Sequence, residues 1–193
     1  MRKILLPLLF STLLFSFDKQ DVERLLEEEV CQNCDLSDAN LSHLDLSIFE
    51  IQDSNLSGVD FSHSNLFMAE LQGSNLEGAN LENTILWKAD LTSCKLNNVK
   101  AKGVNLKGAK LKKAIIENSD LSYSSTWKAD FTHAEIKNVN FYNSELGDAK
   151  FYENDLRDSN LTGSILYKTK FKNTHLTKEQ YNYAKSEEAI FIK

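Results

Sequence analysis

The sequence has very little of the residues that interrupt folded chains, since its 193 residues include a single proline, Pro7, and seven glycines. No proline- or glycine-rich linker divides it, and one domain is the simplest organisation. Basic residues are also in deficit, 22 against 28 acidic ones, for a net charge of −6. A net acidic chain binds nucleic acid poorly, so no nucleic-acid partner is expected. What is present, 41% hydrophobic and 26% charged residues, is typical of a globular protein and excludes disorder.

The N-terminus has the pattern of a secretory signal peptide. Arg2 and Lys3 precede an apolar stretch, residues 4–17, which only three hydroxyl residues interrupt. This stretch is shorter than the ~20 residues that a helix needs to cross the hydrocarbon layer. We therefore predict a signal peptide at residues 1–17 that is cleaved between residues 16 and 19. The mature protein would be periplasmic, lumenal or secreted, and would meet a membrane only transiently during export.

The rest of the chain is dominated by a five-residue repeat. From Leu36 to Leu176 every fifth residue is a large apolar one, with only Ala101 and Thr126 departing and no insertion or deletion. The residue two places earlier is small or of modest size. A period of five fits neither a helix at 3.6 nor a flat strand at 2. Each unit is therefore expected to form one side of a coil, with two residues turned inward and three outward.

Resemblances at longer range indicate how many sides the coil has, because residues stacked on adjacent coils should be alike. They recur at 20 residues rather than 15, in Phe131, Phe151 and Phe171, in His43 and His63, and at twice that distance in Trp87 and Trp127. Four sides per coil are therefore predicted. The array would make about seven coils, a rod roughly 34 Å long at the ~4.8 Å spacing of β-strands.

The units Ala39-Asn40-Leu41, Ala79-Asn80-Leu81 and Ala89-Asp90-Leu91 resemble those of the pentapeptide-repeat family. The resemblance covers about three quarters of the chain. It implies an all-β solenoid, a right-handed quadrilateral β-helix, over residues 31–176. It says little about activity, because that family includes gyrase-inhibiting DNA mimics as well as many exported proteins without an assigned role.

A solenoid exposes backbone edges and apolar core at both ends, so capping segments are expected. In residues 18–30 an amphipathic helix would place four apolar residues on one face, namely Val22, Leu25, Leu26 and Val30. In residues 177–193, Thr177 and Gln180 match a capping box that would start a second short helix. The apolar tail, residues 189–192, is expected to dock back on the rod.

Few residues are candidates for chemistry. Cys31 and Cys34 have the C-x-x-C spacing of redox dithiols, but no βαβ unit surrounds them. In an exported protein, a local disulfide that pins the cap to the first coil is the favoured interpretation. Cys94 takes an inward position and is expected to be a core thiol. His43 and His63 share a column on the outer wall, where exposed side chains are favoured over a zinc site.

No catalytic constellation is predicted, because the abundant Ser, Asp and Asn residues are explained by the repeat itself. The chain is therefore expected not to be an enzyme. No cofactor and no metal is predicted either.

Sorting the outward positions by coil gathers aromatic residues in one column. That column reads Ser47, Phe67, Trp87, Lys107, Trp127, Gly147 and Tyr167. The neighbouring positions include Met68, Lys88, Lys128 and Lys168 on one side and Ile85 and Ile165 on the other. Exposed aromatic residues in a line, flanked by lysines, predict a binding face. The competing interpretations are that tandem duplication copied one aromatic residue, or that the C-terminal tail packs there.

These features predict a non-enzymatic, exported scaffold whose aromatic face docks a protein partner. The alternative is a polysaccharide ligand that stacks on the same rings. A third hypothesis, gyrase inhibition by DNA mimicry, follows from the family resemblance alone and is disfavoured. It requires a cytoplasmic location and a continuous acidic surface, whereas residues 95–113 hold seven lysines and no acid.

Overall fold

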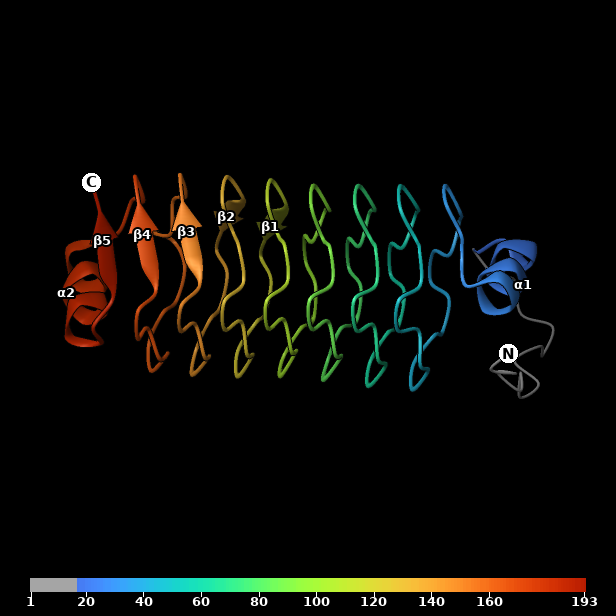
Figure 1. Ribbon diagram of the computed structural model, residues 1–193, viewed down its shortest axis with the longest axis horizontal. Coiled ribbons are helices and arrows are strands. Elements are labelled where there is room, and N and C mark those ends of the chain that lie inside the picture. The colour runs from blue at the N-terminus through green and yellow to red at the C-terminus, as the bar shows by residue number, and fades with distance from the viewer. Residues whose placement is uncertain (1–16) are drawn as a thin grey trace.

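The computed structural model describes residues 17–193, which form a straight rod with a helix at each end (Figure 1). Helix α1 (Lys19–Glu28) lies at one end and α2 (Lys178–Ser186) at the other, so the chain advances steadily along the long axis. The predicted signal peptide lies outside the described residues except for Phe17, which packs against the core. Within residues 17–193, no helix is long and apolar enough to span a membrane.

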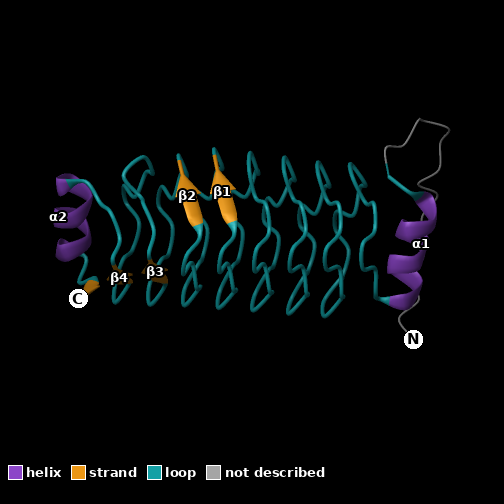
Figure 2. Cartoon of the chain, turned by 90° about the horizontal axis from the view of Figure 1, so that it is seen from above, coloured by secondary structure: helices purple, strands orange, loops and turns teal. Residues whose placement is uncertain are grey.

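Parallel β-bridges between residues 20 apart define the coil. One turn is described by the pairs Val30–Glu50, Asp35–Asn55, Asn40–Asp60 and Asp45–Asn65, and the same four series continue along the rod. The chain therefore returns beside itself every 20 residues, with four bridged positions per turn, which is the period that the sequence predicts. Figure 2 shows the successive turns side by side from a second direction.

Only a few sides are long enough to be named strands. These are β1 (Ile115–Glu117) and β2 (Glu135–Lys137), which pair in parallel, and β3 (Lys150–Tyr152), β4 (Lys170–Lys172) and β5 (Ile190–Ile192), which form a second parallel sheet. Five residues must supply both a side and a corner, so most sides keep a single bridge. The corner residue two places after the large apolar one has a left-handed φ, for example 71° at Gly103. This conformation suits Gly, Asn and Asp, which explains how often they occur there.

The two inward residues of each unit fill the inside of the rod. Every residue of the predicted apolar register from residue 36 to residue 171 is buried, and this includes Ala101 and Thr126. The smaller residues two places earlier are buried with few exceptions. The predicted register is therefore confirmed as the core.

Identical rings on successive coils measure the rise of the rod. The ring centroids of Phe131 and Phe151 lie 4.8 Å apart and those of His43 and His63 4.9 Å apart, both with nearly parallel planes. This is the spacing of hydrogen-bonded β-strands. Each turn of the coil therefore advances the chain by about 4.8 Å along the axis.

Inward hydroxyl groups satisfy backbone carbonyls of the preceding coil. Ser74 donates from its Oγ to the carbonyl oxygen of Ile51 at 2.7 Å, and Thr84 donates to that of Phe61 at 2.8 Å. The same contact, between residues 23 apart, recurs along the rod in Ser119, Ser144 and Thr169. A buried hydroxyl needs a partner, and here the coil supplies it. These serines and threonines are therefore part of the coil's structure.

Outward Asn and Asp residues hold the corners. The Oδ1 of Asn65 accepts a hydrogen bond from the backbone N–H of Phe67 at 3.1 Å. The Nδ2 of the same Asn65 donates to Asp45 on the preceding coil at 3.0 Å. Such local side-chain to backbone bonds are the reason that Asn and Asp favour turns. Their abundance is therefore explained by the corners of the coil, as the sequence predicts.

Helix α1 closes the N-terminal end and is shorter than the sequence predicts. Val22, Leu25 and Leu26 are buried against the core. The helix ends at Glu28, because Glu29 adopts a left-handed φ of 62° and starts the first coil. The expectation that Val30 belongs to the buried helix face is therefore wrong, since its side chain is 39% exposed and its backbone bridges to the next coil.

The C-terminal helix α2 is held by its first turn. The capping box expected from the sequence is present, since Thr177 and Gln180 exchange side-chain to backbone hydrogen bonds. The Nε2 of Gln180 also donates to the carbonyl oxygens of Leu156 and Ser159, at 2.7 and 2.8 Å. These carbonyls belong to the last coil. Gln180 therefore joins the cap to the end of the rod.

The tail docks on the same end. Strand β5 pairs with β4, and the ring of Phe191 stacks on that of Phe171 at 5.5 Å. Tyr181 of α2 covers Phe191 from outside, with ring centroids 4.5 Å apart. The tail thus continues the wall that carries β3 and β4. It does not lie on the aromatic column, so that competing interpretation of the column is wrong.

Candidate functional site: an aromatic stripe along one wall

Backbone hydrogen bonds place the aromatic column on one wall of the rod. The carbonyl oxygens of Trp87, Trp127 and Tyr167 each accept an N–H from the coil before, at 2.9, 2.8 and 3.0 Å. The intervening positions 107 and 147 are bonded in the same way. We call the four aromatic residues of this column, Phe67, Trp87, Trp127 and Tyr167, the aromatic stripe.

The rings of the aromatic stripe are partly exposed and packed along the wall. Trp87, Trp127 and Tyr167 are 44%, 43% and 47% exposed. Phe67 is more covered because its ring lies against that of Trp87, with centroids 5.0 Å apart. Phe67 and Trp87 therefore form one joined apolar surface, and the rings of Trp127 and Tyr167 continue the stripe farther along the same wall.

Gly147 makes room for one of these rings. A Cβ atom at this position would lie 3.0 Å from Cδ1 of Trp127, closer than side chains normally approach. The indole thus lies across the wall toward the next coil. The sequence places Gly147 in the same column but does not predict this contact. The one indication was a glycine on the coil that follows Trp127.

Each of three rings carries a lysine ammonium over its face. The Nζ atoms of Lys88, Lys128 and Lys168 lie 5.2, 4.0 and 4.8 Å from the ring centroids of the aromatic residues that precede them. This is the range of cation–π attraction. A hydrogen bond with Tyr167 also raises the pKa of Lys168 above its ordinary value. The stripe therefore combines aromatic rings and positive charge. The sequence predicted that the lysines flank the rings, but not that the ammonium groups lie over them.

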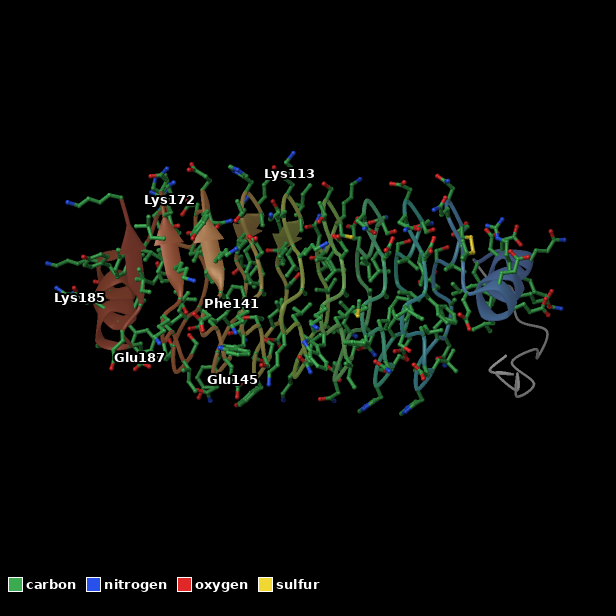
Figure 3. The ribbon with its side chains drawn as sticks, viewed as in Figure 1. Lys113, Phe141, Glu145, Lys172, Lys185 and Glu187 are labelled. Atoms are coloured by element: carbon green, nitrogen blue, oxygen red, sulfur yellow. A yellow bond between two sulfur atoms is a disulfide. The ribbon has the colours of Figure 1, made fainter. Side chains whose placement is uncertain are left out.

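The borders of the stripe differ in character. Met68, Ile85 and Ile165 are exposed and extend the apolar surface. Between Trp87 and Trp127 the aromatic stripe is interrupted by Lys107, whose Nζ lies 3.9 Å from the carboxylate of Glu145. Figure 3 shows Glu145 at the opposite edge of the rod from Lys113.

A second aromatic pair lies on another wall and was missed in the sequence. Tyr123 and Tyr142 meet edge to face with centroids 5.7 Å apart, and both are exposed. Lys102 lies over the ring of Tyr123. The pair escapes column sorting because its members occupy different positions within their units. Because the pair is confined to two rings on another wall, it is a suitable control surface.

The lysine-rich segment, residues 95–113, is partly neutralised by acids of other coils. Lys110 pairs with Asp90 at 2.9 Å and Lys112 with Asp130 at 3.5 Å. Burial acts to raise the pKa of Asp90, but hydrogen bonds from Thr92 and Lys110 outweigh it and leave that pKa lowered. Positive charge that is paired along the rod is less available to a ligand.

Cys31 takes the large inward position one unit before Leu36, and Cys34 takes the small inward position two residues before Leu36. Their sulfur atoms are bonded to each other, with the Cα atoms 5.6 Å apart, and both residues are buried. The N–H of Cys31 donates to the carbonyl of Glu50 at 2.7 Å, as the large apolar residues do in later units. The repeat thus starts one unit earlier than its leucines indicate.

The surroundings of this disulfide supply their own cation. Asp21 and the two sulfurs lie within 4.8 Å of one another, and they are the one group of three potential metal ligands found among residues 17–193. The guanidinium of Arg24 lies 3.0 Å from the Asp21 carboxylate and contacts Cys34. Asp21 also accepts the N–H of Asp35 at 2.8 Å, which ties α1 to the first coil.

Cys94 lies in the core, whereas His43 and His63 lie on the outer wall. Cys94 is buried and donates from Sγ to the carbonyl of Leu71 at 2.9 Å. It is therefore a core residue, as predicted, and its burial raises the pKa of the thiol to about 12. His43 and His63 stack on the exposed wall. They belong to no group of three potential metal ligands within the described part of the chain.

The four-sided parallel coil and its five-residue unit define a repeat protein whose interior is filled and whose outer walls are the surfaces available for binding. The chain belongs to the pentapeptide repeat family. Eight copies of the family's pentapeptide repeats match, over residues 51–83, 74–112, 89–125, 114–152 and 148–177. No curated protein matches the sequence.

Solved structures of pentapeptide repeat proteins are similar to the chain. HetL, which is involved in heterocyst differentiation regulation in the cyanobacterium Nostoc, is 22% identical over 83% of this chain and 84% of its own, with a TM-score of 0.27. A protein of the Arabidopsis thaliana thylakoid lumen is 26% identical over 68% and 73%, with a TM-score of 0.37. QnrB1, a plasmid-mediated fluoroquinolone resistance protein, is 16% identical over 75% and 82%, with a TM-score of 0.36.

Proposed function

We propose that the protein is a non-enzymatic interaction scaffold that is exported and binds a protein partner through the aromatic stripe. Its scaffold is the right-handed quadrilateral β-helix implied by the family resemblance. The observation that carries the proposal is the alignment of four partly exposed aromatic residues, three of them paired with lysines, on one wall of a rigid rod.

The composition of the stripe favours a protein ligand. Trp and Tyr are enriched among the residues that dominate binding energy at protein interfaces, and they act best where a partner excludes water from them. Trp87 and Trp127 expose just under half of their surface. Lys107 is the one residue that separates them in the column. Burying such surface removes apolar area from water.

The lysines favour an acidic protein over a neutral polysaccharide. A sugar ring that stacked on Trp127 from the side of Lys128 would have to displace its ammonium, which lies 4.0 Å from the ring centroid. A partner with carboxylates would pair with the lysine instead of removing it. We therefore favour an acidic protein as the ligand, and the binding experiment would reveal a polysaccharide ligand instead.

Replacing both tryptophans, W87A/W127A, is expected to weaken partner binding about 1000-fold, because each truncation of a central aromatic residue costs about 2 kcal/mol and the two together about 4 kcal/mol. The measurement is crosslinking of the full chain in its native compartment, followed by identification of the crosslinked partner and an affinity titration with that purified partner.

The matched control is Y123A/Y142A, which removes the same number of exposed aromatic rings from another wall. It should leave the affinity unchanged. Equal binding by W87A/W127A and the unmodified chain would contradict the proposal. A tryptophan fluorescence change with cell-wall polysaccharide, together with no protein crosslink, would replace it by the polysaccharide alternative.

A further inference from the structure

The rings of the aromatic stripe that carry lysines lie at equal intervals. Trp87, Trp127 and Tyr167 are 40 residues apart, which is two turns of the 20-residue coil. The stacked phenylalanines Phe131 and Phe151 set the rise at 4.8 Å per turn. Successive ring and lysine pairs are therefore about 9.6 Å apart along the axis. A ligand that uses all three must repeat at that interval.

Extended peptide conformations differ in their repeat. A polyproline-II helix has three residues per turn and a rise of ~3.1 Å per residue, so equivalent side chains recur every ~9.3 Å. Side chains on one face of a β-strand recur every ~6.7 Å. If one of them lies at Trp87, none on that face therefore lies at Trp127. Two turns of an α-helix span ~10.8 Å, and the misfit doubles by Tyr167. Only the polyproline-II repeat stays in step over all three rings.

The charges at the stripe select among such segments. Among residues 17–193, no carboxylate lies within ion-pair distance of Lys88, Lys128 or Lys168. Each ammonium lies over the ring of the aromatic residue that precedes it, at the exposed outer surface, and Lys168 also hydrogen-bonds with Tyr167 and feels the charges of Asp148 and Glu188. An incoming carboxylate would pair with a lysine, while an apolar pyrrolidine ring next to it would pack on the indole.

We propose that the aromatic stripe binds a proline-rich, acidic segment of a partner protein in the polyproline-II conformation, with one carboxylate for each three-residue turn. This inference rests on the proposed function, that the stripe binds a protein, and names the chemistry of that partner. The segment runs along the rod axis and presents one face to Trp87, Trp127 and Tyr167. The stiffness of a polyproline-II segment lowers the ordering cost of such binding.

The probe is a synthetic peptide of five Pro-Pro-Glu repeats, titrated into the full chain and followed by tryptophan fluorescence. Saturable binding is expected, and the triple variant K88Q/K128Q/K168Q should bind at least tenfold more weakly. Two control peptides separate charge from conformation: Pro-Pro-Lys repeats reverse the charge, and Gly-Ser-Glu repeats keep the charge without the polyproline-II conformation. Both should bind at least tenfold more weakly than the probe.

A register variant tests the spacing itself. K107W/W127A keeps the number of rings but moves one of them by one coil, so that it lies next to Trp87. The changes are on the outer wall, and circular dichroism would verify that the coil is retained. Binding of the Pro-Pro-Glu peptide should fall at least tenfold, as in W127A alone. Full binding by K107W/W127A would overturn the spacing argument.

The outcomes separate this inference from the proposed function. If the Pro-Pro-Glu peptide does not bind while W87A/W127A still abolishes binding of the crosslinked partner, the polyproline-II inference is wrong and the protein-binding function stands. If the Gly-Ser-Glu peptide binds as tightly as the probe, conformation plays no part and the inference is also wrong. If neither peptide nor partner depends on the tryptophans, both proposals fail.

Discussion

Phe151→Ala is expected to lower the free energy of unfolding by about 3–5 kcal/mol, the range for deleting a buried aromatic side chain. Phe151 is fully buried and its ring stacks between those of Phe131 and Phe171, at 4.8 and 5.6 Å. It also meets Phe141 edge-on at 6.1 Å. The cavity would remove contacts from the coils on both sides. Urea unfolding monitored by circular dichroism measures the loss.

The control for this substitution is Phe67→Ala, which removes the same side chain from the outer wall. Phe67 contacts Trp87 but lies outside the core, so a change below about 1 kcal/mol is expected. Similar losses for the two variants would mean that the inward register has been assigned to the wrong residues.

Gln180→Ala is expected to destabilise the C-terminal end by about 2–4 kcal/mol, because it removes three hydrogen bonds worth about 0.5–1.5 kcal/mol each. The side chain donates to the carbonyls of Leu156 and Ser159 and accepts the N–H of Thr177 at 2.8 Å. Amide hydrogen exchange of the last coil, followed by mass spectrometry, should show faster exchange in that coil and little change near α1.

Two variants make this result specific. Glu179→Ala changes the exposed neighbour in the same helix turn and should leave exchange unaltered. Gln180→Glu retains an acceptor for Thr177 but removes the donor to the two carbonyls. It should therefore reproduce most of the loss. Unchanged protection in both Gln180 variants would show that the cap is held by its apolar residues alone.

Most of the rod was predictable because one rule governs each unit. The large apolar residue at every fifth position fixes the inward face, and even Ala101 and Thr126, which are not large apolar residues, remain buried in the same register. The recurrence of phenylalanine at positions 131 and 151 predicted a turn of 20 residues, because stacked positions share an environment. A strict period leaves little freedom to the fold.

The ends were less predictable, because capping depends on a single geometry rather than on a repeat. The left-handed turn at Glu29 stops α1 before Val30, although the apolar pattern continues. Cys31 takes the position of a large apolar residue one unit before Leu36, and its residue type does not resemble the leucine found there in later units. Periodicity could not reveal either feature.

The candidate site was predicted as a column but not as a surface. The sequence showed that Trp127 and Lys128 are neighbours, but it could not show that the ammonium lies over the indole ring. It also could not show that the indole lies across Gly147. Side-chain direction depends on rotamers and local packing, which a one-dimensional pattern does not contain.

The 20-residue coil brings the aromatic stripe onto one wall of the rod. The most direct test is a distance measurement by pulsed electron paramagnetic resonance between spin labels on F67C/Y167C, in a chain that also carries Cys94→Ser and keeps the Cys31–Cys34 disulfide. Five turns separate the labelled positions, so a backbone separation of about 24 Å is predicted after allowance for the label linkers. A separation of about 32 Å, the value for a 15-residue coil, would show that the coil does not have 20 residues per turn.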